Sequence, residues 1–169
     1  MARTNTKIGD VFSVKVDEKS KKYLQYIISD LMQLNSDVIR AFKKTYPIDA
    51  TPELLEIVQG EVEFYAHCVT KWGIKLGFWE KVGNISIVGE TSQILFRDTN
   101  DYGHKAGEEP IKVSKKWHIW KVNDKDFTSV GELVGENRKA EIGLVINPES
   151  ITIRMKTGSY DFPFYPGYE

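Results

Sequence analysis

The chain has a single cysteine, Cys68, and no long apolar run. One cysteine excludes an internal disulfide. The apolar runs are too short for the roughly 20 residues that an apolar helix needs to cross a bilayer. The opening MARTNTKIGD also lacks the apolar stretch of a secretory signal. We therefore expect a protein that works in a reducing cytoplasm and does not insert into a membrane.

An excess of either charge is also absent. Lys and Arg number 23 against 24 for Asp and Glu, which leaves a formal net charge of -1. Proteins that depend on neutralising phosphates carry a basic surplus, so nucleic acid is not an expected partner. Within the 169 residues, no segment rich in Pro, Gly or Ser, or in charges of one sign, marks a linker. Residues 1–169 are therefore expected to form a single domain.

The sequence has little that points to catalysis, a metal or a cofactor. It contains no GxxxxGK[ST] loop, no GxGxxG after a predicted strand, no paired CxxC and no HExxH. His67 and Cys68 are adjacent, but successive side chains of a strand leave opposite faces. We expect Cys68 to be buried and inert, and His67 to be exposed or hydrogen-bonded. His104 and His118 do not complete a zinc spacing, and His118 is expected to pack against Trp120. No enzyme activity, metal or cofactor is predicted.

Alternating apolar and polar residues dominate the chain and predict β-strands. The expected strands cover residues 10–16, 22–29, 38–46, 61–70, 93–97, 116–122, 140–146 and 150–156. Residues 50–60 break this pattern, because Thr51 can cap a helix of about two turns that Pro52 begins and Gly60 ends. We expect a mainly β (α+β) fold, either a strongly curved antiparallel sheet or a partly open barrel, with one or two short helices.

Residues 72–83, WGIKLGFWEKVG, place large aromatic side chains among glycines. Trp72 and residues 75–76 predict one helical turn, and Gly77 suits the left-handed position that ends it. Phe78 and Trp79 are then expected to fold back onto the core. The segment is predicted to be a structural connection.

A polar loop over residues 98–110 and an aromatic tail over residues 160–169 are the best candidates for a surface that binds a partner. The carboxylates of the loop are expected to stay solvated. The aromatic side chains of the tail either close one end of the barrel or anchor a protein partner, and the loop would then supply a polar rim. The candidate partner-binding residues are Asp98, Asp101, Tyr102, Glu108, Glu109, Phe162, Phe164, Tyr165 and Tyr168.

The first half of the chain carries several short motifs in a fixed order. They are KIGDVF at residues 7–12, PELLEI at residues 52–57, a strand with Phe64, and GIKLGFWEKVG at residues 73–83. Over roughly residues 7–90, the chain resembles the immunity protein 26 family of bacterial polymorphic-toxin systems. The resemblance implies a small cytoplasmic protein that binds a toxin domain and blocks it. It assigns no contact residues, and the second half of the chain departs from the family pattern.

Two functions therefore stay open. The first is an immunity-type protein, without catalytic activity, that neutralises a cognate toxin domain by occluding its active surface. The alternative is a non-catalytic β domain that binds a small ligand or a peptide, with Tyr23, Tyr26, Trp79 and Trp120 as possible walls of a cleft. The sequence leaves the oligomeric state undetermined.

Overall fold

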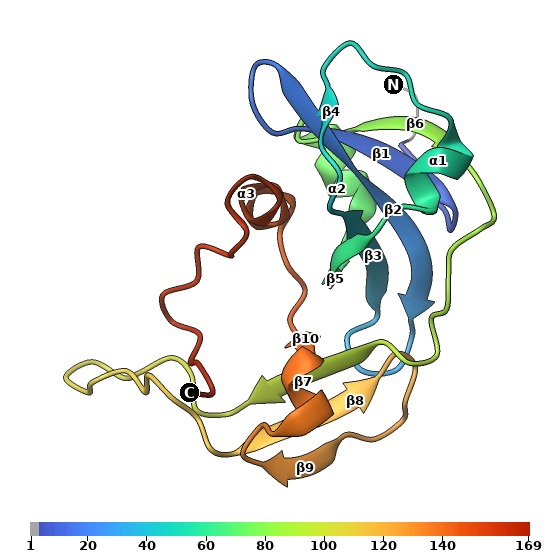
Figure 1. The fold of residues 1–169 in the computed structure, drawn as a ribbon. Helices are drawn as coiled ribbons and strands as arrows, with labels where there is room; N and C mark the ends of the chain where they lie inside the picture. Colours follow the sequence, from blue (N-terminus) through green and yellow to red (C-terminus); the bar gives the residue numbers. More distant parts are fainter. Residues whose placement is uncertain (1–3) are drawn as a thin grey trace.

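Two β-sheets and short helices make up the fold of residues 4–169, the part of the chain that the computed structural model describes (Figure 1). The first sheet has the order β5-β3-β2-β1-β6, with β4 paired to β2. Its strands are β1 (Asp10–Lys15), β2 (Ser20–Asp30), β3 (Ser36–Phe42), β4 (Tyr46–Pro47), β5 (Val62–Cys68) and β6 (Glu80–Asn84). All of its pairings are antiparallel.

The second sheet has the order β10-β7-β8-β9. Its strands are β7 (Leu95–Thr99), β8 (Trp117–Lys121), β9 (Thr128–Gly131) and β10 (Glu141–Ile142). β10 pairs with β7 in parallel, and the other pairings of this sheet are antiparallel. The helices are α1 (Leu54–Val58), α2 (Thr70–Lys75) and α3 (Pro148–Thr157), and Gly135–Lys139 forms a 3-10 helix, η1.

Alternation along the strands of the first sheet gives it two apolar faces, and a helix covers each. On one face, Phe12 and Ile39 pack with Ile151 and Met155 of α3. On the other, Val11 and its neighbours pack against α1 through Ile57 and Val58. Burial of apolar surface on both sides is the main stabilising contribution to this sheet.

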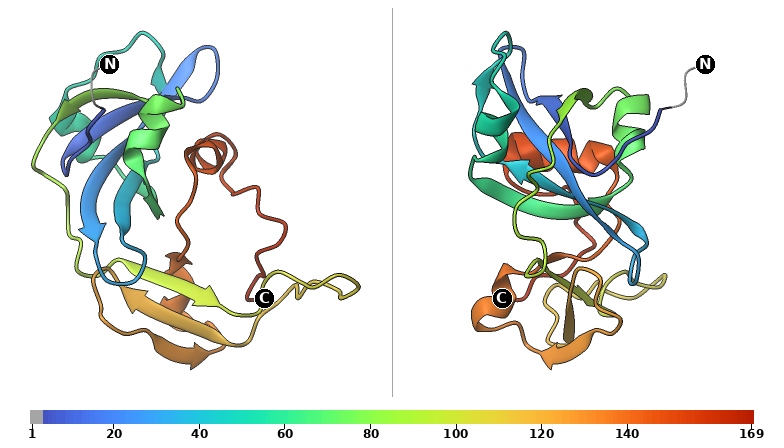
Figure 2. Two further views of the ribbon diagram at one scale, coloured as in Figure 1. Left: turned by 180° about the vertical axis from the view of Figure 1, so that it is seen from behind. Right: turned by 90° about the vertical axis from the view of Figure 1, so that its right-hand side faces the viewer.

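The two sheets share a third apolar cluster. Ile27 and Val38 of the first sheet pack with Phe96 and Trp120 of the second. After β10, the chain returns to the first sheet as α3 and then runs back as the tail to the second sheet, where it ends (Figures 1 and 2). The tail therefore starts at the end of α3, on the first sheet, and ends beside the second sheet.

The structure confirms a mainly β, α+β fold, and it differs from a strongly curved single sheet or partly open barrel. The strands form two separate sheets that are not strongly curled, and neither closes into a barrel within residues 4–169. The physical reason is the connection over residues 85–94, which carries the chain from β6 to a new sheet. The predicted strand 38–46 is likewise divided into β3 and β4.

The predictions of strands at 140–146 and 150–156 are wrong in large part. Within 140–146 only Glu141–Ile142 forms a strand, Val145 makes an isolated β-bridge to His67, and residues 148–157 form α3. Local signals start and stop this helix: the Asn147 side chain accepts a hydrogen bond from the Ser150 N–H at 2.8 Å, Pro148 holds the first turn, and Gly158 ends it with φ of 89°. Ile151 and Ile153 alternate as in a strand, but the buried side chains of this stretch, such as Ile151 and Met155, are spaced as on one face of a helix.

The predicted helix near residues 52–60 is confirmed as α1, although Thr51 is not its cap. Glu53 occupies the N-cap position and makes no side-chain cap hydrogen bond. The connection predicted at residues 72–83 matches the structure as far as Trp79, but residues 80–83 belong to strand β6, which pairs with β1. α2 ends before Gly77, which has φ of 77°, and Trp79 is buried on the core. A Cβ on Gly73 would lie 1.6 Å from the Trp79 indole, so the close packing requires glycine there.

Candidate functional site

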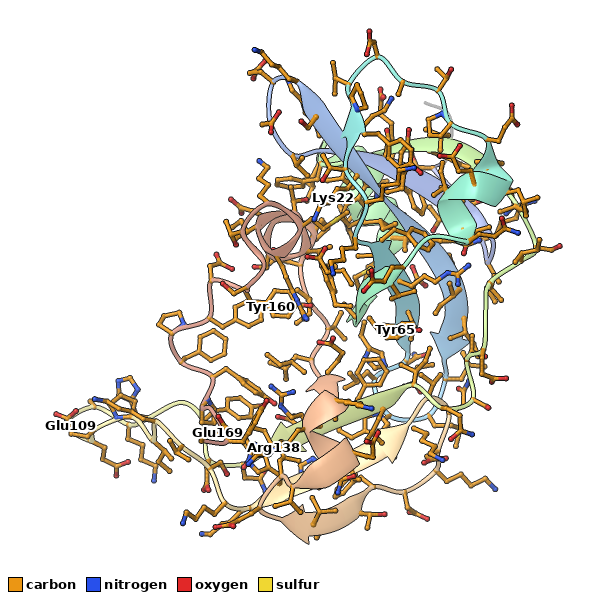
Figure 3. All side chains as sticks on the ribbon, in the orientation of Figure 1. Lys22, Tyr65, Glu109, Arg138, Tyr160 and Glu169 are labelled. Atoms are coloured by element: carbon orange, nitrogen blue, oxygen red, sulfur yellow. The ribbon has the colours of Figure 1, made fainter. Side chains whose placement is uncertain are left out.

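The polar loop and the aromatic tail lie side by side, and we call them together the loop–tail surface (residues 98–113 and 160–169). The Gly167 N–H donates to the Lys112 carbonyl at 2.8 Å, and the Ser114 N–H donates to the Gly167 carbonyl at 3.0 Å. Beyond this junction, residues 103–113 are all exposed. The loop projects from the second sheet with Glu109 toward its end (Figure 3).

Tyr165 ties the tail to the base of the loop. Its hydroxyl donates to Asp98 Oδ1 at 3.1 Å, and its ring centroid lies 5.4 Å from that of Tyr102 and 6.0 Å from that of Trp117. Burial raises the pKa of the Tyr165 hydroxyl, and the nearby Asp98 carboxylate raises it further. Three of the predicted residues, Asp98, Tyr102 and Tyr165, therefore form one packed anchor.

The expectation that the loop carboxylates stay solvated is wrong for Asp98. Asp98 lies on β7 and is half-buried, and this burial raises the pKa of its carboxyl. Hydrogen bonds from the Thr99 N–H and the Tyr165 hydroxyl act in the opposite direction. No local pattern indicates this burial, because Tyr165, which contacts Asp98, lies 67 positions away in the tail.

Asp101 is a second anchor of the loop. Its carboxylate accepts a hydrogen bond from the Ser114 hydroxyl at 3.0 Å, and its N–H donates to Thr99 Oγ1 at 3.2 Å. Glu108 and Glu109 differ from it, since both are exposed and neither forms an ion pair with any residue in 4–169. Asp101 holds the base of the loop, whereas the two glutamates are free to meet a partner.

The remaining aromatic residues of the tail have different environments. The Phe162 ring lies 4.8 Å from the Tyr160 ring and packs on the core of the first sheet. Phe164 lies 5.4 Å from Phe162 and keeps 43% of its surface exposed. Tyr168 turns toward Arg97 and Arg138. The tail thus closes part of the fold and also presents an aromatic side chain to solvent.

A cavity of about 500 Å³ lies beneath the tail, and we call it the basic pocket. Its walls come from β7, η1, β10, the end of α3 and the tail. The lining residues are Arg97, Arg138, Lys139, Ala140, Glu141, Ile142, Arg154, Gly158, Ser159, Tyr160 and Tyr168. Four of these side chains are cationic and one is acidic, in a chain whose net charge is -1. Of the residues predicted from sequence, only Tyr168 lines it.

Sequence reasoning missed this pocket because its cations are far apart along the chain. Arg97, Arg138 and Arg154 come from β7, η1 and α3. No run of basic residues marks them, and their proximity depends on the return of α3 to the first sheet. Arg154 is nevertheless well ordered by its surroundings: it makes two hydrogen bonds to Glu141, of 2.7 and 3.1 Å, and stacks on Phe64.

Two further cavities lie on the first sheet. One, of about 660 Å³, is lined by Trp79 and other residues that include Lys15 and Lys81, and another, of about 270 Å³, is lined by Tyr23 and α1. Tyr26 and Trp120 are buried in different apolar clusters. The four aromatic residues proposed as walls of one ligand cleft therefore do not share a cavity.

His67 forms a buried pair that the sequence did not reveal. Its Nε2 lies 2.8 Å from Asp30 Oδ2, and both side chains are fully buried. Burial lowers the pKa of the imidazole, against the opposing effect of Asp30. Asp30 Oδ1 also accepts hydrogen bonds from the N–H groups of Met32 and Gln33. The pair resembles an acid–base dyad in composition, but a substrate does not reach it.

The other titratable candidates behave mostly as expected. Cys68 is buried, and burial raises the pKa of its thiol. The ring of His118 stacks on Trp120 with centroids 5.9 Å apart, as predicted. His67 is hydrogen-bonded, which was one of its two expected states. Across residues 4–169, no group of three or more His, Cys, Asp or Glu side chains is arranged to hold a metal ion.

None of the helices within residues 4–169 combines the length and apolar character required to span a membrane. No protein-family model, curated protein or solved structure matches the chain. The resemblance to the immunity protein 26 family stays a prediction.

Proposed function

We propose that this chain is a non-enzymatic, immunity-type protein that binds a cognate toxin domain with the loop–tail surface and occludes the active surface of the toxin. The observation that carries the proposal is the contrast within this surface. Its base is fixed by the Tyr165–Asp98 and Ser114–Asp101 hydrogen bonds, while residues 103–113 are exposed throughout. A fixed base reduces the entropy that the loop loses when it binds.

The exposed side chains of this surface suit a protein partner. Ile111, Val113 and Phe164 are 44%, 39% and 43% exposed. Val113 forms an isolated parallel β-bridge with Gly167, so the apolar end of the loop lies against the tail that carries Phe164. Apolar and aromatic side chains at the centre of an interface supply most of its affinity, and a polar rim excludes water around them.

Glu108 and Glu109 add a charge preference to this surface. They are adjacent and exposed, and neither is neutralised by an ion pair within residues 4–169. Two unpaired carboxylates favour a partner with a basic binding face, and they increase its association rate more than its final affinity. Inhibition by such contacts requires no chemistry, only a fit to the toxin surface.

Co-expression with candidate toxin domains encoded near the gene of this chain tests the proposal. The wild-type chain is expected to restore growth and to co-elute with the toxin domain in size-exclusion chromatography. The double variant Glu108→Lys/Glu109→Lys is expected to associate with the toxin domain at least about tenfold more slowly, because both charges are reversed.

The matched control reverses two exposed carboxylates away from this surface, Glu18→Lys and Glu61→Lys. Their side chains are 91% and 72% exposed. The control is expected to bind like the wild type. Absence of both growth rescue and a complex with the wild-type chain would overturn the proposal.

A further inference from the structure

Arg97 is the one cationic side chain of the basic pocket that forms no ion pair with a carboxylate among residues 4–169. Arg138 pairs with Glu169, Lys139 with Glu136 at 2.7 Å, and Arg154 with Glu141. The Nε of Arg97 is buried and has no hydrogen-bond acceptor within the same residues. A part-buried charge without a counter-ion is unfavourable, so an anion bound beside the Arg97 guanidinium would be stabilising.

The position of the Arg97 side chain is nevertheless fixed. Its Nη1 donates a hydrogen bond to the Ala140 carbonyl. Its guanidinium carbon lies 5.5 Å from the centroid of the Trp117 ring and 5.3 Å from that of the Tyr168 ring. Stacking against aromatic rings holds a guanidinium in one plane and leaves its remaining N–H groups available in that plane.

We propose that the basic pocket binds a small organic oxyanion, a carboxylate or a phosphate ester, with Arg97 as the residue that pairs with the anionic oxygens. A planar guanidinium matches the two oxygens of such a group, and charge-assisted hydrogen bonds of this kind are the strongest in proteins. The volume of about 500 Å³ falls within the range of small-molecule sites. The surplus of cations in the lining favours an anion over a neutral ligand.

The rest of the ligand is constrained by the pocket walls. Tyr160 and Tyr168 both line the cavity. Figure 3 shows Tyr160 below α3, with Arg138 and Glu169 farther down. Aromatic walls favour a planar apolar group attached to the anion. Glu108, Glu109 and Phe164 do not line this cavity, so the proposed ligand site is separate from the exposed side chains proposed to meet a toxin, and goes beyond that function.

The test is a titration of the isotope-labelled full chain, followed by amide NMR shifts, with inorganic phosphate, benzoate and adenosine 5′-monophosphate as three separate probes. Saturable shifts at residues 97, 138–142 and 158–160 with benzoate or the nucleotide support the site, and comparison of the two assigns the anion as carboxylate or phosphate. Shifts with inorganic phosphate alone would show that the aromatic walls do not contribute and would contradict an organic ligand. Absence of saturation with all three probes in the millimolar range would overturn the proposal.

Three variants assign the role of Arg97. Arg97→Met keeps a long side chain between the rings and is expected to weaken binding of the best probe at least about tenfold, since the charged hydrogen bonds are lost. Lys139→Gln removes a cation whose side chain is 75% exposed, so folding is preserved. It is expected to weaken binding about two- to fivefold, because Glu136 loses its partner beside the pocket.

The control is Lys43→Gln, directly after β3, with a 63% exposed side chain, which is expected to bind like the wild type. If Arg97→Met does not fold, Lys139→Gln decides the outcome by comparison with this control. If Arg97→Met folds and binds as tightly as the wild type, the proposal is contradicted. If it does not fold, wild-type binding by Lys139→Gln contradicts the proposal.

Discussion

His67 Nε2 and Asp30 Oδ2 lie 2.8 Å apart, and neither side chain has any exposed surface. Asp30 ends β2 and His67 belongs to β5, on the opposite side of β3 in the same sheet. The His67 ring also lies 4.1 Å from the ring of Phe96 on β7. This buried pair therefore lies where the first sheet meets the second.

Removal of Asp30 is expected to destabilise the protein strongly. Asp30→Ala leaves the imidazole and the N–H groups of Met32 and Gln33 without their acceptor. A buried donor left without its acceptor costs about 1–3 kcal/mol of the free energy of unfolding, and Asp30→Ala leaves more than one. Urea denaturation measures the change. The control, Asp17→Ala, removes an exposed carboxylate that accepts a hydrogen bond from Lys19, and equal losses in the two variants would contradict the prediction.

The same pair predicts a pH dependence of stability. Burial lowers the pKa of His67 in the folded state below its ordinary value of 6.5. As the pH falls through about 6.5, the unfolded chain takes up a proton that the folded chain does not, so the free energy of unfolding decreases toward the folded pKa. Above that range, the contribution of His67 is constant.

Thermal unfolding of the wild type and of His67→Gln between pH 5 and pH 8 isolates this effect. The free energy of unfolding is expected to change with pH more steeply in the wild type than in the variant. The difference in slope is at most about 1.4 kcal/mol per pH unit, which is the limit for one proton. Parallel profiles for the two proteins would show that His67 does not titrate as described.

The packing of α3 on the first sheet gives a third prediction. Ile151 is fully buried there, whereas Ile153, two residues later on the same helix, is only partly buried. Ile151→Ala is expected to lower the free energy of unfolding by about 2–5 kcal/mol, because it removes buried methylene groups and leaves a cavity. Ile153→Ala is the matched control and should cost clearly less in the same urea titration. Equal losses of free energy of unfolding in the two variants would contradict the packing of α3 on the sheet through Ile151.

The anchor of the loop–tail surface is tested by Tyr165→Phe. This change removes the hydroxyl that donates to Asp98 and keeps the ring against Tyr102 and Trp117. We expect a loss of about 1–3 kcal/mol of stability, since a half-buried carboxylate loses a hydrogen bond. Hydrogen exchange over residues 98–113 should become faster in the variant. Unchanged exchange would mean that Tyr165 does not fix the loop.

Sequence patterns predicted β1, β2, β3 and β5 of the first sheet, but they missed β6. Alternation identified β1 and β5, and aromatic and β-branched residues identified β2. These strands bury one set of side chains beneath α3 and another beneath α1. The glycines at positions 73 and 77 identified the turn that buries Trp79, since their roles depend on local geometry. These features follow from residues that are close in the sequence.

The missed features depend on contacts between distant residues. α3 was predicted as a strand because Ile151 and Ile153 alternate, although Asn147 and Gly158 supplied capping signals at its two ends. The burial of Asp98 required Tyr165, and the basic pocket required Arg97, Arg138 and Arg154 from three elements. Nothing in the local sequence indicates which of the evenly distributed charges will meet.

Hydrogen–deuterium exchange on the complex with a toxin domain that the chain neutralises in the co-expression test addresses the central claim most directly. The proposal predicts slower exchange in residues 100–113 and 160–169 on complex formation, with residues 16–20 of the β1–β2 turn unchanged. Protection confined to that turn or to α1, with residues 100–113 exchanging as in the free chain, would contradict it.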